Sequence, residues 1–485
     1  MFGKPATPAK VPTDSVIAFR FFDDTPLWKA FILYSMFVFD DLLDPQKLHR
    51  SLEALVKRDG WHKLGARLRR NHNGGLEYHV PVEFTKQRPG LTYAHVDYAI
   101  NAADHPLASK LPKASSQPAI VCDPDEFQDL IRSEGSPTSM REYLNQDIPQ
   151  LGLYIATFKD KTLVTLYWPH TLMDAMGKKA LLNAWTLILQ GRDDEVVPPY
   201  GGGGDPLAHL GKNPAELHGL SNRRLSVLGL AKYGIRNIGD FFRTHENRMV
   251  CIPGSFIASL RAKAIEELVS AGVDQPFLTE GDVLCALWTR VAISHLPNDS
   301  QRLVVLNNAY SLRTALEADL LPKGAPYVSN AIGFIHVLLD TQEIFKKPLS
   351  HVAFAIRSGI QQLGTRAQVE AFASMWRESS VKLPPLFGSS RMHMITYSNW
   401  SKARLYELDF SAATVKPGEG NKKPGFPTYI QNNQFGLVLP NAFPIIGKDN
   451  EGNFWLSGYM NKGQWEKIGH QLSGMSYVKN KPSLT

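Results

Sequence analysis

The chain has 485 residues, of which 43% are hydrophobic and 20% are charged, and its formal net charge is +7. This composition fits a well-packed soluble globule that is too long for one ordinary core, so we expect two domains or one pseudo-symmetric pair. The basic residues are dispersed along the chain, which argues against a nucleic-acid groove and suits an anionic small ligand.

The cysteines and the apolar segments bear on where in the cell the protein is expected. Cys122, Cys251 and Cys285 do not pair evenly and show no metal-ligand spacing, so we expect a reducing compartment and no bound metal. Residues 1–14 lack the apolar core of a signal peptide. The densest apolar segment, residues 30–39, is too short to span a bilayer. We therefore expect a cytoplasmic protein without a transmembrane segment.

The first 190 residues alternate between strand and helix patterns. Residues 26–40 mix both signals, whereas residues 44–58 place leucines opposite basic residues and predict a helix. Residues 162–169 form an extended apolar run, and residues 177–189 have a helical period. The stretch between them is therefore expected to be a strand-to-helix corner.

His170 stands at this corner, with Asp174 four residues later. About one His-x-x-x-Asp is expected by chance in such a chain, so the spacing alone carries little weight. The chain holds three, and those that begin at His295 and His336 fall in a polar loop and in a predicted strand. Only His170 lies between rigid elements that can hold an imidazole outward, which suits a general base acting on a hydroxyl or an amine.

A long crossover follows the predicted helix. The Pro- and Gly-rich residues 196–206 cannot sustain a helix or a central strand. Leu225–Phe242 has the pattern of a mildly basic amphipathic helix. We interpret this helix as packing across the domain junction, and a membrane-surface role is the alternative.

The second half of the chain, like the first, contains both helix and strand patterns. Helices are expected over 256–269, from Thr279 and from Gln464, and strands over 303–309, 331–339 and 454–460. Two α/β halves joined by a long crossover leave a cleft or tunnel at their interface, where ligands often bind.

Taken in order, several segments resemble the BAHD superfamily of acyl-CoA-dependent acyltransferases, and most of all its fungal branch with the trichothecene O-acetyltransferases. The resemblance covers nearly the whole chain, and the ordered set of motifs is its strength. The segments are Trp61 to Leu68, His170 to Gly177, Asp282 to Arg290, Ser311 to Arg313, Tyr327 to Ala331, and Ser398 to Trp400 with Asp409 nine residues later.

The resemblance implies an α/β fold of two pseudo-symmetric chloramphenicol-acetyltransferase-like domains with a central tunnel at their interface. It implies an N-terminal acyltransferase domain over residues 1–195, a crossover linker over 196–248 and a C-terminal acyltransferase domain over 249–485. A monomer is the family expectation. The acyl-CoA thioester would be a co-substrate rather than a bound cofactor, and a small-molecule acceptor would be the other partner.

The family's site residues carry over by position. His170 would be the general base, and Ser398, with Trp400 beside it, would help to hold the oxyanion. The resemblance implies that Asp174 forms a salt bridge that fixes the corner. It also implies that Gly177 gives structural support to the site. Arg313 and Asp409 are candidates for a second buried pair. Lys416, Lys422 and Lys423 are candidates for the coenzyme A phosphates, with a solvated loop as the alternative.

Two positions depart from the family pattern. Ala175 replaces the usual glycine after the motif aspartate, and Gly177 comes two places later. The family's Asp-Phe-Gly-Trp-Gly segment survives only as Asp409-Phe410-Ser411-Ala412-Ala413. The loop near the cofactor mouth is therefore expected to be reshaped, which leaves the acyl donor open.

The favoured function is transfer of an acyl group, with acetyl as the first choice, from acyl-CoA to a hydroxyl or amine of a small specialised metabolite. One alternative keeps the fold for CoA-independent chemistry, such as hydrolysis, carrier-linked transfer or cyclisation. Peptide-synthetase condensation domains carry two adjacent histidines, and Pro169 takes the first position here, which counts against that class. A non-catalytic ligand-binding module is the other alternative.

Overall fold

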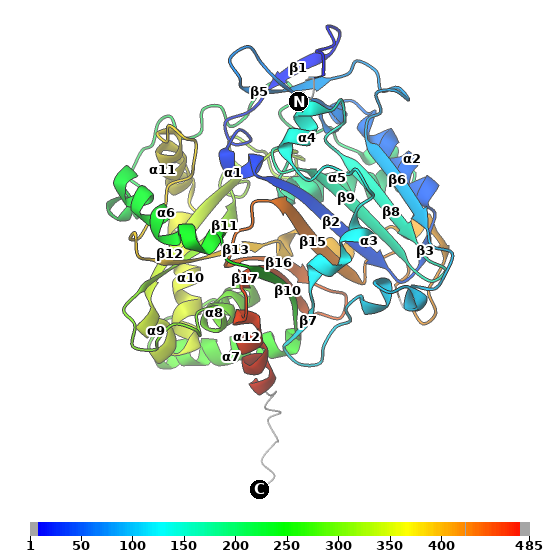
Figure 1. Cartoon of the computed structure of the whole chain (residues 1–485). Helices are drawn as coiled ribbons and strands as arrows, with labels where there is room; N and C mark the ends of the chain where they lie inside the picture. Colours follow the sequence, from blue (N-terminus) through cyan, green and yellow to red (C-terminus); the bar gives the residue numbers. More distant parts are fainter. Residues whose placement is uncertain (1–7, 422, 476–485) are drawn as a thin grey trace.

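The computed structural model describes the backbone of residues 8–421 and 423–475, and the side chains of all of these except residues 240 and 241. Two α/β lobes are built on two large sheets (Figure 1). The five-stranded sheet has the order β15-β2-β9-β8-β6, and the seven-stranded sheet has the order β12-β11-β13-β16-β17-β10-β7. The mixed α/β, two-lobed fold predicted from the sequence is confirmed.

The first sheet contains β2 (Phe31–Phe39), β6 (Thr92–Asp97), β8 (Gly152–Thr157), β9 (Thr162–Pro169) and β15 (Tyr429–Gly436). The second contains β7 (Ala119–Cys122), β10 (His245–Ile252), β11 (Leu303–Ser311), β12 (Ile332–Asp340), β13 (His393–Asn399), β16 (Ala442–Lys448) and β17 (Phe454–Asn461). Two small sheets are formed by β1 (Ser15–Ala18), β5 (Leu76–Val80) and β4 (Arg67–Arg70), and by β14 (Thr414–Lys416) and β3 (Leu42–Leu43).

The longer helices cover these sheets. They are α2 (Pro45–Val56), α5 (Ala175–Leu189), α6 (Val227–Phe241), α7 (Gly254–Ser270), α8 (Glu280–Ala292), α10 (Leu349–Leu363), α11 (Arg366–Arg377) and α12 (Gln464–Gly474). Shorter helices are α1 (Pro26–Lys29), α3 (Gln128–Ile131), α4 (Met140–Asn145) and α9 (Thr341–Lys346). Within the described residues, no helix combines the length and apolarity that a bilayer crossing requires.

The two lobes exchange a strand. β7 comes from the N-terminal part of the chain but pairs with β10 in the second sheet, and β15 comes from the C-terminal part but pairs with β2 in the first (Figure 1). Sheet membership therefore does not follow a division of the sequence at residues 195 and 249. Each lobe is completed by a strand from the other end of the chain.

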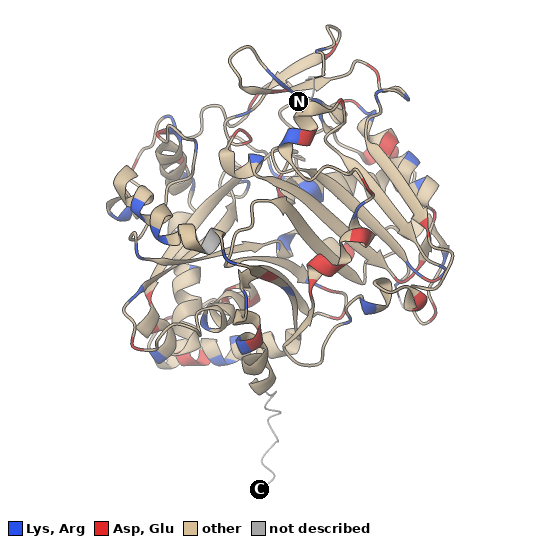
Figure 2. Cartoon of the chain, viewed as in Figure 1, with Lys and Arg blue, Asp and Glu red and all other residues tan. Residues whose placement is uncertain are grey.

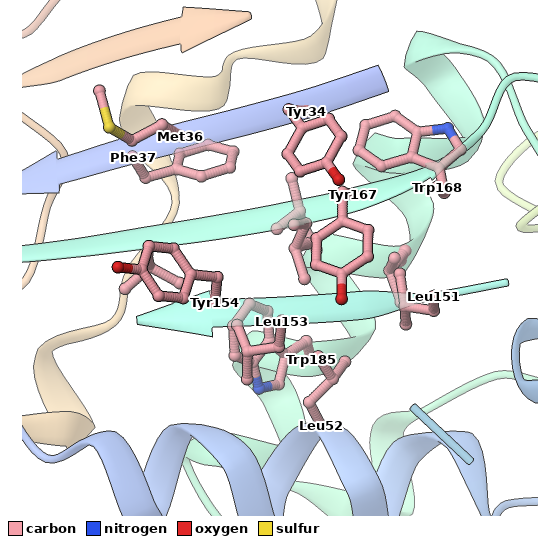
Figure 3. Close-up of a cluster of buried hydrophobic side chains, with 14 of the residues drawn as sticks. Tyr34, Met36, Phe37, Leu52, Leu151, Leu153, Tyr154, Tyr167, Trp168 and Trp185 are labelled. Carbon is pink, nitrogen blue, oxygen red and sulfur yellow. The ribbon is translucent and has the colours of Figure 1, made fainter. Parts of the chain in front are cut away.

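β9 is the central strand that leads to the site. All eight of its residues are buried, and it pairs with β2 on one side and with β8 on the other. Figure 3 shows the aromatic core around it, where Tyr34, Tyr167 and Trp168 lie near the strands and Trp185 reaches toward α2. The Trp185 indole donates to Ser51 Oγ of α2 at 2.8 Å. The strand β9 and the helices α5 and α2 are thus packed together, and the Trp185–Ser51 hydrogen bond joins the two helices.

Most predicted elements are present. The expected helix over 44–58 is α2, with Asp44 as its N-cap, and the mixed segment 26–40 divides into α1 and β2. The helix expected from Thr279 is α8, which begins with a capping box between Thr279 and Asp282. A cap of this kind satisfies backbone N–H groups that have no partner within the helix.

The predicted packing of Leu225–Phe242 is wrong. The helix is present as α6, but the apolar side of α6 points to solvent, with Val227 86% exposed and Phe242 85% exposed. Among the described side chains of residues 225–242, Leu225, just before the helix, is the buried one, and it lies in a small cluster with Val305 and Met392. The junction between the lobes is closed by other residues.

Candidate active site

His170 lies directly after β9, where the chain turns into α5. Its backbone N–H donates to Phe31 O at the start of β2, at 3.0 Å. Its backbone carbonyl accepts from Asn330 Nδ2 at 3.0 Å. One hydrogen bond comes from each lobe, so the corner is held from both sides.

The imidazole of His170 stacks on an indole. The Trp28 and His170 rings are 4.3 Å apart between centroids, with planes inclined by 18°. Trp28 is itself fixed, because its backbone N–H donates to the Thr25 side chain and its indole donates to Phe22 O. The ring of His170 therefore has a defined orientation, while the residue keeps part of its surface exposed.

The protonation state of His170 suits a base. Burial lowers the pKa of His170 below the ordinary histidine value of 6.5, and the nearby charge of Asp174 acts in the opposite direction. Its Nδ1 is buried without a hydrogen-bond partner among the described residues. A neutral imidazole at neutral pH can accept a proton.

Asp174 joins the two lobes. Its carboxylate caps α5 by accepting from the Met176 and Gly177 backbone N–H groups at 3.0 and 2.8 Å. It also accepts two hydrogen bonds from Arg313, at 2.8 and 2.9 Å, and one from Ala331 N at 2.9 Å. Asp174 is 1% exposed, so this is a buried, fully hydrogen-bonded ion pair.

The predicted pairing of Arg313 with Asp409 is wrong. Arg313 uses its guanidinium on Asp174 and on the Tyr327 and Ser329 carbonyls. Asp409 is partly exposed, and its carboxylate accepts from Ser411 N in a local turn. The salt bridge expected for Asp174 and the second pair expected for Arg313 are therefore one and the same ion pair.

Gly177 lies where a side chain would not fit. A Cβ at this position would stand 2.8 Å from Met173 Cβ and 3.4 Å from Tyr327 O. The close packing of the first turn of α5 against Met173 therefore depends on glycine. This helix start is the one that Asp174 caps.

Ser398 and Trp400 lie at the end of β13 in the second sheet. The Trp400 indole N–H donates to Ser398 Oγ at 2.8 Å, so the hydroxyl proton of Ser398 is left for another acceptor. The Trp400 ring in turn receives the Lys178 ammonium at 4.6 Å. Lys178 belongs to α5, so the structure brings Ser398 and Trp400 against the helix that follows His170.

Lys178 is a charged group that the sequence analysis missed. It is 1% exposed and donates to Ser35 Oγ at 3.1 Å and to Asn432 Oδ1 at 3.0 Å. Burial lowers the pKa of Lys178 to about 7. The available signal was a single charge on the otherwise apolar inner face of the predicted helix.

Replacing Lys178 by methionine is expected to change how stability depends on pH. Between pH 7 and 10.5 the unfolded chain holds a proton on Lys178 that the folded chain releases, so raising the pH stabilises the fold. The free energy of unfolding should rise by up to about 1.4 kcal/mol per pH unit from this group, and Lys178→Met should remove that rise. Urea unfolding at several pH values measures it. The exposed Lys402→Met is the control, and an unchanged slope in Lys178→Met would contradict the expectation.

A polar network continues from His170 to a cavity. Asn330 donates through its backbone and side chain to Asp23 at 2.8 and 2.9 Å. Lys63 lies 3.9 Å from the other Asp23 oxygen, and burial lowers its pKa to about 8. Lys63 and Arg20 line a cavity of about 440 Å³ together with Trp61, Tyr200 and the 201–202 glycines. The crossover thus forms one wall of a ligand-sized space that connects to the His170 backbone carbonyl through Lys63, Asp23 and Asn330.

Of the three candidate phosphate contacts, the structure describes Lys416 and Lys423, and neither of these two lysines forms a hydrogen bond with His170. Lys416 is exposed on β14, which pairs with β3 at the end of β2 remote from His170. Lys423 donates to Asn450 Oδ1 at 3.2 Å and lies 3.9 Å from the Phe426 ring. Lys422 lies outside the described residues. Their contact with coenzyme A stays a prediction.

Among the described residues, no three His, Cys, Asp or Glu side chains converge as metal ligands do. Trp28, which fixes the base, was not singled out from the sequence, whereas Asn330 lies in the Tyr327 to Ala331 motif but was given no role there. A Thr-Pro helix cap before Trp28 was the only local signal.

Comparison with known proteins places this geometry in a family. The Transferase family model matches residues 121–414. Acetyltransferase sphE of Aspergillus fumigatus is 37% identical over 505 residues, covering 98% of each chain. Acetyltransferase adrJ of Penicillium rubens is 34% identical, covering 97% of each. The chain belongs to the Transferase family and is a fungal BAHD acyltransferase.

Other relatives of this BAHD acyltransferase bear different names. A protein named Transcriptional regulator calD, from Penicillium decumbens, is 40% identical over 479 residues, or 96% of this chain and 97% of that protein. Among solved structures, the F. sporotrichioides TRI101 complex with coenzyme A and T-2 matches with a TM-score of 0.67 at 15% identity, over 94% of this chain and 97% of that one. The low identity makes this a likeness of fold.

Proposed function

We propose that this BAHD acyltransferase moves an acyl group, with acetyl favoured, from acyl-CoA to a hydroxyl or amine of a small specialised metabolite. The observation that carries the proposal is the His170 corner: an imidazole with a lowered pKa, fixed by Trp28 and Asn330 and braced by the buried Asp174–Arg313 pair. A regulator that only bound DNA would need none of these groups.

In the proposed reaction, donor and acceptor are bound together. His170 takes the acceptor proton as the acceptor oxygen or nitrogen bonds to the thioester carbonyl carbon, which forms a tetrahedral oxyanion. The oxyanion collapses, the carbon–sulfur bond breaks, and the thiolate of coenzyme A takes the proton back from the imidazolium. The products are an ester or amide and free coenzyme A, without metal or covalent enzyme intermediate.

We assign the oxyanion contact to Ser398. The hydrogen bond from Trp400 occupies a lone pair of Ser398 Oγ and leaves its O–H to donate. Ser398→Ala is expected to lower kcat by roughly 10²-fold, as loss of one oxyanion donor does. Ser398→Thr, which keeps the hydroxyl, should recover most of the rate. If kcat is the same in wild type and in Ser398→Ala, Ser398 does not hold the oxyanion.

The acceptor is proposed to approach through the cavity that Arg20, Lys63 and Val328 line. Its volume of about 440 Å³ falls within the range for small-molecule sites, and its polar wall is joined to His170 through Asp23 and Asn330. Arg20 and Lys63 give this wall a basic character. The Lys416 to Lys423 loop remains the candidate for the phosphates of coenzyme A.

The first test is release of free thiol from a panel of acyl-CoAs, with pooled hydroxylated and amine acceptors and with products checked by mass. Acceptor-dependent release supports the proposal, and the productive donor identifies the acyl group. Folded protein that binds the acceptor pool but releases thiol from no donor would overturn it in favour of CoA-independent chemistry. Product masses distinguish ester or amide formation from simple thioester hydrolysis.

A further inference from the structure

Helix α6 carries an apolar stripe that no part of the described chain covers. The stripe consists of Val227, Leu228, Ala231, Ile235, Ile238 and Phe242, which all fall within an arc of about 100° on a helical projection. Ile235 is 70% exposed, and Leu228 and Ile238 are exposed as well. A surface helix normally turns such a stripe toward the core, and here the stripe faces outward.

The opposite side of α6 is the one that docks on the protein. Tyr233 packs against the cluster of Leu225, Val305 and Met392. Arg236 donates to the Ser390 side chain, and Arg224, just before α6, forms an ion pair with Glu378. The helix is therefore held with its apolar stripe in solvent. A contiguous exposed patch of this kind marks a surface that another body covers.

The sequence of α6 makes the helix dependent on such a contact. Gly229, Gly234 and Gly239 all lie within it, and glycine is among the poorest helix formers. A short isolated helix with this composition is marginal in water. Binding of the stripe to an apolar medium would supply the missing stabilisation.

The charges around the stripe indicate which kind of surface it binds. Residues 223–243 contain five basic residues, Arg223, Arg224, Lys232, Arg236 and Arg243, and one acidic residue, Asp240. Lys232 lies next to the stripe, Arg236 lies farther round toward the docked side, and Figure 2 shows basic positions on α6 at the edge of the molecule. The apolar spacing lasts about two heptads, which is short of the three or four that a coiled coil needs. A negatively charged lipid surface complements both the stripe and its border.

We propose that α6 is an interfacial helix that binds this protein to anionic membranes. The apolar stripe would enter the boundary between headgroups and acyl chains, and the basic border would contact the phosphates. The proposal is independent of the acyl-transfer chemistry, because α6 contributes no side chain to the His170 site.

The test uses the full chain and vesicles of phosphatidylcholine with and without about one-fifth phosphatidylserine, separated by flotation. Wild type should bind the anionic vesicles at least about tenfold more strongly, and less at high salt. The double variant Ile235→Asp/Phe242→Asp should lower binding by tenfold or more. Lys232→Glu should lower the preference for anionic lipid.

Val82→Asp is the matched control, because Val82 is 73% exposed on another part of the surface. It should leave vesicle binding unchanged. All these side chains are exposed, so unfolding temperatures should match that of wild type. Absence of vesicle binding, or equal binding by Ile235→Asp/Phe242→Asp, would overturn the proposal. So would a dimer in sedimentation that this double variant dissociates, because the stripe would then bind a second copy.

Discussion

Replacing His170 with alanine is expected to lower kcat for acyl transfer by roughly 10²- to 10⁴-fold, the usual contribution of a positioned general base. The proton of the acceptor would then have to pass to water, because the described structure places no second imidazole against Trp28 and Asn330. Single-turnover release of coenzyme A measures the loss. Binding of acyl-CoA should be little changed.

The dependence of rate on pH gives a second measurement on the same residue. Only neutral His170 can act as a base, and burial lowers its pKa below 6.5. Activity should therefore persist through neutral pH and fall on acidification, with the midpoint of the acid limb in kcat/KM below 6.5. His295→Ala is the matched control, because His295 has the same spacing to an aspartate but lies exposed in a loop. Retention of wild-type activity in His170→Ala would remove His170 from the mechanism.

Replacing Asp174 with alanine is expected to destabilise the fold by about 3–5 kcal/mol, as breaking one member of a buried ion pair does. The change leaves the Arg313 guanidinium without its carboxylate and takes the cap from α5. It also removes the acceptor for Ala331 N, next to the asparagine that fixes His170. Activity should fall together with stability, because the hydrogen-bond partners of Asp174 are groups that support the corner.

Urea unfolding and kcat measured on the same samples test this account. Arg313→Lys keeps the charge but loses the two-pronged geometry, and it should give a smaller loss than Asp174→Ala. Asp409→Asn should change the free energy of unfolding by less than about 0.5 kcal/mol, since Asp409 is partly exposed in a local turn. Should Asp174→Ala fail to fold, Asp174→Asn supplies the comparison. An unfolding midpoint in Asp174→Ala equal to that of wild type would contradict the role of the pair.

The strand-to-helix corner could be predicted because its determinants are local. An all-apolar strand, a capping aspartate and a helical period occur within 28 residues, from Thr162 to Leu189. The same holds for α2 and α8, because the residue that caps each helix directly precedes it in the sequence. Local signals of this kind need no knowledge of the distant chain.

The partner of Arg313 could not be predicted, because it lies 139 residues away in the sequence. The sequence offered both Asp174 and Asp409 as carboxylates for an ion pair, and only the tertiary fold decides which of them Arg313 meets. The exchanged strands β7 and β15 were not predicted from the sequence, and the sheet that each one joins is likewise decided by contacts with distant parts of the chain. The orientation of α6 was missed because the apolar stripe is identical whether it faces a core or the exterior.

The exchange of β15 has a consequence for synthesis on the ribosome. β2 ends at residue 39, but the strand that covers its open edge ends at residue 436. At ordinary rates of translation, this edge stays without its neighbour for roughly 20–80 s. An uncovered apolar strand edge is a template for aggregation, so the nascent N-terminal lobe is a client for chaperones until the last hundred residues emerge.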